Sequence, residues 1–73
     1  MRISYDNSVD ALYIRLIEGE FQCRTLRLSD TVALNIGPAE QLVGVEVLEA
    51  RKTLQLDDKP TVEVENLLVK VAG

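Results

Sequence analysis

The 73-residue chain contains no histidine, and Cys23 is its only cysteine. These absences exclude an intramolecular disulfide, a zinc site of cysteine and histidine, and a Ser-His-Asp triad within one copy of the chain. Leu, Ile, Val and Phe are nevertheless abundant, which excludes intrinsic disorder as the main interpretation. The sequence therefore predicts a single folded domain over residues 1–73 that lacks the commonest small-enzyme chemistries.

Long apolar runs and concentrated positive charge are also lacking. The N-terminal residues Met1–Asp6 include polar side chains from the second position on, whereas a secretory signal needs roughly 7 to 15 apolar residues in succession. No apolar run approaches the roughly 20 residues of a membrane-spanning helix. The net charge is −4, and Lys and Arg are scattered instead of forming the basic patch that nucleic-acid binding requires. We therefore expect a cytoplasmic protein with no membrane segment and no nucleic-acid partner.

β-Branched residues are frequent, and their stiff side chains favour strands over helices. Four segments alternate between apolar and polar residues, as half-buried strands do: residues 3–5, 12–16, 32–36 and 43–47. We expect Val43, Val45 and Val47 to pair with the even-numbered residues of the segment 12–16 and to form most of the core. Each fully buried Val or Leu stabilises the fold by roughly 1.5 to 3 kcal/mol.

The segment between these strands contains a turn and a change of phase. Glu18-Gly19-Glu20 predicts the turn of a hairpin, because Gly tolerates a positive φ. The apolar positions are odd at Phe21 and Cys23 and become even at Leu26, which predicts a β-bulge near Arg24 and Thr25. Cys23 belongs to the apolar phase and is expected to be a buried hydrophobic residue.

The alternation ends after residue 48. Helix formers dominate residues 49–54 and predict a short helix there. Beyond the break at Asp57–Pro60, residues 61–65 alternate as a strand would, while the apolar residues between 64 and 71 also fit helical spacing. Both interpretations of this tail stay open. The predicted fold class is α+β: a small, predominantly antiparallel sheet of five to six strands with one short helix near residues 49–54.

Two stretches carry a family resemblance: Tyr5-Asp6 with Asp10–Ile14, and Val43–Ala50, behind the opening Met1–Ile3. Together they resemble the domain of unknown function 2283 family of small prokaryotic proteins over about residues 1–54, and residues 55–73 form a variable C-terminal segment. The sequence departs from the family pattern at Glu40, where a glycine is usual. The resemblance implies a compact β-rich domain with a little helix and no established activity. Some members resemble the antitoxin-like partner of a two-protein module.

The same stretches contain the polar residues that are candidates for chemistry. We expect a polar cluster of Tyr5, Asp6, Asp10, Tyr13 and Glu46. In it, Gly44 would allow close approach, and Glu46 would be a general base only if it were buried. No partner acid or nucleophile is evident, however. The favoured interpretation is that Glu46 lies on the solvent face of its strand and pairs with Arg15 or Arg24.

Asp6, Ser8 and Asp10 have the spacing of the first ligands of a calcium loop. Ala11 and Ile17 stand where that loop needs its glycine and its bidentate glutamate, so we expect neither a metal nor a cofactor. The favoured interpretation is structural: Asp6 forms an Asx turn, and Asp10 accepts backbone N–H groups that enter the next strand.

A chain of this length hides only about 60% of its unfolded surface, so self-association is expected. The candidate interface lies on the second face of the sheet and in the tail: Ile17, Leu42, Leu48, Leu67, Leu68, Val69 and Val71. The favoured function is a noncatalytic, homodimeric interaction or structural module. Two alternatives stay open, namely an acidic regulatory partner of a basic protein such as a toxin, and a ligand-binding or enzymatic site in the polar cluster.

Overall fold

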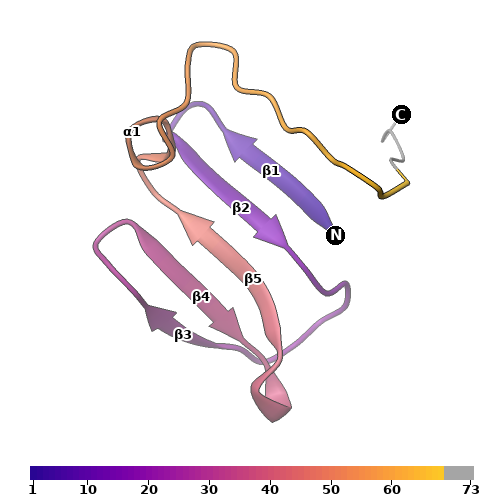
Figure 1. Cartoon of the computed structure of the whole chain (residues 1–73). Coiled ribbons are helices and arrows are strands. Elements are labelled where there is room, and N and C mark those ends of the chain that lie inside the picture. The colour runs from indigo at the N-terminus through magenta and orange to yellow at the C-terminus, as the bar shows by residue number, and fades with distance from the viewer. Residues whose placement is uncertain (69–73) are drawn as a thin grey trace.

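A computed structural model describes residues 1–68, which form one five-stranded sheet and a one-turn helix (Figure 1). The elements are β1 (Arg2–Asp6), β2 (Ala11–Arg15), β3 (Arg24–Arg27), β4 (Val32–Ile36), the 3-10 turn η1 (Pro38–Glu40), β5 (Leu42–Val47) and α1 (Ala50–Thr53). The strand order is β1-β2-β5-β4-β3, and every neighbouring pair is antiparallel. The structure confirms the α+β class and the short helix.

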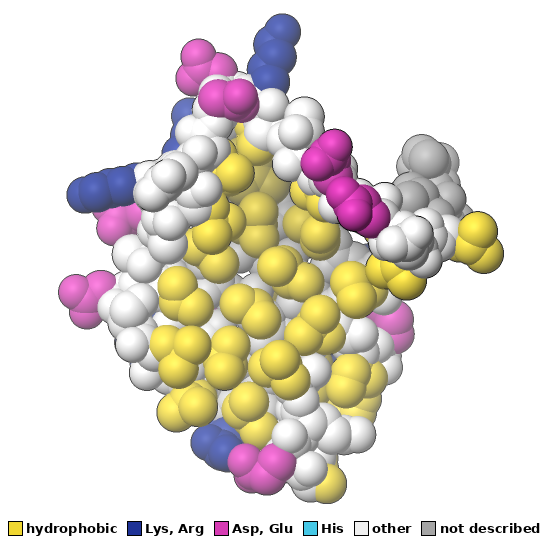
Figure 2. All heavy atoms as spheres, viewed as in Figure 1, with side chains coloured by type: hydrophobic (Ala, Val, Ile, Leu, Met, Phe, Trp, Pro, Cys, Tyr) yellow, Lys and Arg dark blue, Asp and Glu magenta, His cyan; other side chains and the backbone are white. Residues whose placement is uncertain are grey.

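The register of the strands gathers large apolar side chains on one face of the sheet. The predicted pairing is confirmed, because Leu12 lies opposite Val47 and Ile14 lies opposite Val45. We call this side the apolar face; it consists of Ile3, Tyr5, Leu12, Ile14, Leu26, Val32, Leu34, Val45 and Val47. Figure 2 shows it as a nearly continuous hydrophobic surface across the sheet.

The opposite side of the sheet is the polar face. Two rows of cross-strand neighbours cross it. One row contains Ser4, Tyr13, Glu46, Ala33 and Arg27, and the other contains Arg2, Arg15, Gly44, Asn35 and Thr25. The small residues of these rows are buried under the longer ones, since Ala33 is 2% exposed and Gly44 is also buried.

The buried core is small for a folded domain. It consists of Ala33, Ile36, Val43, Val47 and Ala50. On the apolar face, Ile3 and Leu26 remain 45% and 43% exposed. Within the described residues, the apolar face is therefore only partly covered.

The predicted hairpin after β2 is wrong. β2 already has β1 on one side and β5 on the other, so the chain crosses the end of the sheet through residues 16–23 and enters β3 at the far edge (Figure 1). Val45 and Val47 of β5 are the cross-strand partners of Ile14 and Leu12 on the side of β2 that a hairpin would have used.

The predicted bulge and the predicted burial of Cys23 are wrong for one shared reason. β3 begins only at Arg24, so Phe21 and Cys23 belong to the connection and not to the strand, and Cys23 is exposed. The register shift of the sheet lies instead between Asn35 and Ile36 of β4.

The segment 61–65 forms neither of the two structures that its pattern allowed. It follows an extended course without regular secondary structure (Figure 1). Residues 61–68 make no backbone–backbone hydrogen bond within the described part of the chain, because no strand lies in register beside them. The helical interpretation of the tail also fails as far as residue 68. Val69 and Val71 lie outside the described residues.

The other candidate interface residues have different environments. Ile17 and Leu48 are half-buried, whereas Leu42 is 39% exposed and Leu67 and Leu68 are largely exposed. The open apolar surface of the sheet therefore lies mainly on the face that was expected to be its core.

Candidate functional site

The turn between β1 and β2 is held by Asp6. Its carboxylate Oδ1 accepts a hydrogen bond from the Ser8 backbone N–H at 2.9 Å and from the Ser8 hydroxyl at 2.6 Å. These bonds hold the pKa of Asp6 below its usual value, and the bond from the Ser8 hydroxyl has the larger effect. The predicted Asx turn is confirmed.

Asp10 connects the start of β2 to both β1 and α1. Its Oδ1 accepts a hydrogen bond from the Tyr5 hydroxyl at 2.6 Å, and its carboxylate oxygens lie 3.2 and 3.4 Å from the backbone nitrogen of Arg51. The Asp10 carbonyl accepts the N–H of Ala50, and Arg51 Nη2 donates to Asn7 Oδ1 at 2.8 Å. The Asp10 carboxylate was expected to accept backbone N–H groups at the start of the next strand, but the backbone N–H that it accepts is that of Arg51 in α1.

Tyr5 is affected by this contact. The hydrogen bond to Asp10 is the largest of the effects that raise the pKa of the Tyr5 hydroxyl above its usual 10.0. The phenol keeps its proton more strongly in the folded chain than in the unfolded chain. Its contribution to stability is therefore present below the unfolded pKa and is lost as the pH rises through the folded pKa.

We expect an ultraviolet titration of the tyrosines, followed near 295 nm from about pH 8 to about pH 12, to contain a late component that is absent from Tyr5→Phe. Asp10→Ala should move this component to lower pH, because the acceptor is removed. A late component that persists in Tyr5→Phe would contradict this assignment.

Tyr13 lies across β5 on the polar face. Its hydroxyl accepts a hydrogen bond from Asn35 Nδ2 of β4 at 2.9 Å. The ring passes over Gly44, where an added Cβ atom would lie 2.5 Å from Tyr13 Cζ. Gly44 is thus required because the aromatic ring occupies the place of a side chain.

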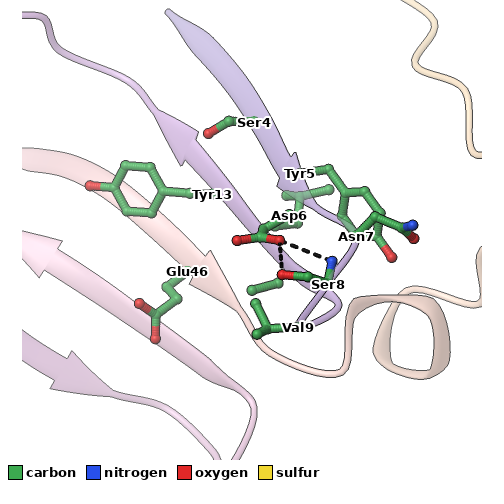
Figure 3. Close-up of a pocket in the computed structure, with 10 residues that line it drawn as sticks. Ser4, Tyr5, Asp6, Asn7, Ser8, Val9, Tyr13 and Glu46 are labelled. Carbon is green, nitrogen blue, oxygen red and sulfur yellow. Dashed lines mark hydrogen bonds between the residues drawn. The ribbon is translucent and has the colours of Figure 1, made fainter.

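Glu46 lies beside Tyr13 at the edge of an open depression of about 720 Å³ (Figure 3). The depression is lined by Ser4, Tyr5, Asp6, Asn7, Ser8, Val9, Ala11, Leu12, Tyr13 and Glu46. The two arginines proposed as partners of Glu46 are engaged elsewhere: Arg15 donates to the carbonyls of Ile17 and Gly19, and Arg24 forms an ion pair with Glu40.

The structure thus divides the expected polar cluster between two places. Asp6, Tyr13 and Glu46 border the depression on the polar face. Tyr5 also lines the depression, but its hydroxyl is bonded to Asp10, and Asp10 lies outside the lining and ties β1 and β2 to α1. Within residues 1–68, no three His, Cys, Asp or Glu side chains are arranged to hold a metal ion. The visible contacts of this cluster support the turn, the helix and the sheet.

Sequence reasoning missed two members of these networks. Asn35 of β4 donates to Tyr13 of β2 across β5, and Arg51 joins Asp10 and Asn7. The contact of Asn35 with Tyr13 could have been suspected, because Asn35 is a polar residue within an otherwise apolar strand. No local signal pointed to the contacts of Arg51, because Arg51 is 41 residues from Asp10.

These features define a small α+β domain whose single antiparallel sheet has one apolar and one polar face. A family model described as "Protein of unknown function (DUF2283)" matches residues 2–51 of the 73, and the chain belongs to this family. The matched region contains all five strands. No curated protein and no solved structure matches the chain. Among residues 1–68, no helix has the length and apolar character needed to span a membrane.

Proposed function

We propose that this protein is a noncatalytic interaction module that forms a homodimer through the apolar face of its sheet. The observation that carries the proposal is the open apolar face itself. Ile3 and Leu26 at its two edges are nearly half exposed, and Leu28 beside it is 60% exposed. A sheet with one apolar face must bury that face against a second layer, and the described residues of one chain supply only a small part of that layer.

The five strands supply part of the area that a dimer interface needs. Five strands about 4.8 Å apart, each about five residues long at about 3.3 Å per residue, give a projected area of roughly 400 Å². This area is about half of the roughly 800 Å² that each partner buries in a standard interface, so residues outside the five strands have to contribute the rest.

The chemistry of the face favours a second copy over a basic protein. All nine side chains of the apolar face are uncharged, so a cationic partner would find no carboxylate there. An apolar face can match itself across a two-fold axis, as the same patch does in most homodimers. Each apolar Å² removed from water contributes about 25 cal/mol.

The salt dependence of binding distinguishes a homodimer from a complex with a basic protein. Two copies with a net charge of −4 each repel one another, and salt screens that repulsion, so added salt should leave the homodimer as tight or make it tighter. Binding of an acidic protein to a basic partner would instead weaken with salt.

We expect sedimentation equilibrium to show a dimer at micromolar concentration. Leu26→Asp should weaken the dimer by about 100-fold, because the two-fold axis would bury two unpaired carboxylates. The matched control is Thr25→Asp, which places the same charge on the polar face of the same strand and should weaken the dimer far less, by no more than about tenfold.

Far-UV circular dichroism would verify that both variants remain folded. A monomeric mass for the unaltered chain at high concentration, or equal effects of the two aspartates, would overturn the proposal.

A further inference from the structure

We infer that residues Thr61–Glu65 of each copy pair with the outer edge of β3 in the other copy and form the sixth strand of its sheet. We call these residues the C-terminal arm. This inference rests on the proposed homodimer and specifies how the two copies are arranged.

The arm has the pattern of a half-buried strand but no strand partner among residues 1–68 of its own chain. Val62 and Val64 alternate with Thr61, Glu63 and Glu65, and the two valines are 61% and 44% exposed. The arm follows an extended course (Figure 1) and makes no backbone–backbone hydrogen bond within the described residues. Pro60 precedes it, which is compatible with the first position of a strand.

The outer edge of β3 is open in the described chain. All four residues of β3 are exposed, and the strand pairs only with β4. Such an edge presents unpaired backbone N–H and C=O groups that another strand can use. Leu26 lies on the apolar face, and Thr25 and Arg27 lie on the polar face.

The side chains of the arm match those of β3 in polarity and in charge. If Val62 and Val64 extend the apolar face beside Leu26, Glu63 and Glu65 fall on the same side as Arg27, because side chains alternate along a strand. Among the described residues, the Arg27 guanidinium makes only contacts of 3.4 and 3.5 Å to backbone carbonyls. It is therefore available to a carboxylate.

The other open edge is a poorer match. In β1, Arg2 is already paired with Glu18 at 3.0 Å, and Asp6 would repel the two glutamates of the arm. The charges of β1 cancel, whereas those of β3 are both positive and those of the arm are both negative.

The topology determines which copy supplies the arm. Figure 1 shows the arm beyond the β1 side of the sheet and running opposite to β1, while β3 forms the far edge. The arm of one copy therefore has its own sheet between itself and its own β3. A two-fold axis parallel to the strands would place the β1 edge of each copy over the β3 edge of the other. Since β3 runs parallel to β1, the arm would meet the partner's β3 in antiparallel orientation.

A charge-exchange experiment on the full chain tests this arrangement. One variant is Arg27→Glu and the other is Glu63→Lys with Glu65→Lys. Each should weaken its own homodimer by about tenfold. In each homodimer, residue 27 of one copy and residues 63 and 65 of the other would carry charges of the same sign, and this repulsion would occur twice. Mixing the two variants should restore a dimer close to unaltered affinity, because both arm contacts in the heterodimer join opposite charges. Analytical ultracentrifugation with one variant fluorescently labelled measures all three affinities.

Net charge alone predicts a different result. Arg27→Glu lowers the net charge of −4 by two, and the double lysine variant raises it by four, so unspecific repulsion would weaken one homodimer and strengthen the other. The matched control is Glu20→Lys with Asp58→Lys, which raises the charge by the same four at exposed residues outside the arm and should not weaken the dimer.

The outcomes separate this inference from the proposed function. If the charge variants dimerise like the unaltered chain, or if the mixture gains nothing over the separate variants, the arm does not pair in trans with β3, although the dimer itself stands. If the unaltered chain is monomeric, the proposed homodimer fails first.

Discussion

Gly44→Ala is expected to lower the free energy of unfolding by about 3 kcal/mol, near the upper end of the usual cost of overpacking. The added Cβ would lie 2.5 Å from Tyr13 Cζ and even closer to the Tyr13 hydroxyl. The ring would have to leave its place over β5 and would give up the hydrogen bond from Asn35. Urea denaturation, followed by circular dichroism, measures the difference.

A second substitution shows whether the ring is the cause. In a Tyr13→Ala background only the Ile14 carbonyl oxygen, 3.1 Å from the added Cβ atom, still crowds the new methyl group. Gly44→Ala should then cost only about 1 kcal/mol, and the difference between its costs in the two backgrounds is the coupling that a double-mutant cycle detects for residues in contact. Equal costs of Gly44→Ala in the two backgrounds would show that the backbone of β5, and not the Tyr13 ring, requires the glycine.

Alternation predicted the pairing of β2 with β5 because that pairing follows from matched apolar faces. Leu12, Ile14, Val45 and Val47 form one surface in whichever order the strands occur. The strand order itself could not be read from the local sequence. Glu18-Gly19-Glu20 has the composition of a hairpin turn, but β2 was already flanked by two better partners, so the same residues became part of a crossing connection.

The candidate site shows the same division between local and distant contacts. The Asp6–Ser8 bonds span two residues and were predictable from the turn chemistry alone. The contact between Asp10 and Arg51 depends on the position of α1, which is set by the end of β5 and not by the sequence near Asp10. Proximity in sequence therefore suggested one polar cluster, whereas the topology places Asp10 at the helix.

The arm illustrates a further reason why a sequence pattern and a single chain can disagree. Residues 61–65 have the alternation of a strand, yet a strand needs a neighbour with free backbone groups in register. One copy of the chain provides such an edge at β3, on the side of the sheet opposite its own arm. The pattern and the structure are both explained if the neighbour belongs to a second copy.

Asp10→Ala is expected to lower the free energy of unfolding by about 2 kcal/mol, because it removes a charged acceptor from the Tyr5 hydroxyl and from the Arg51 backbone N–H. Asp10 also has a φ of 54°, a conformation that Asp and Asn tolerate better than Ala.

Asp10→Asn keeps an acceptor oxygen and the backbone tolerance, so its cost should be about 1 kcal/mol or less. Hydrogen exchange would locate the effect: in Asp10→Ala, protection at the Arg51 amide should fall more than protection at amides in the middle of β5. Equal costs of the alanine and asparagine variants would mean that only the negative charge of Asp10 matters and not its acceptor geometry. A loss of protection spread evenly over the sheet would contradict the assignment of Asp10 as the residue that anchors α1.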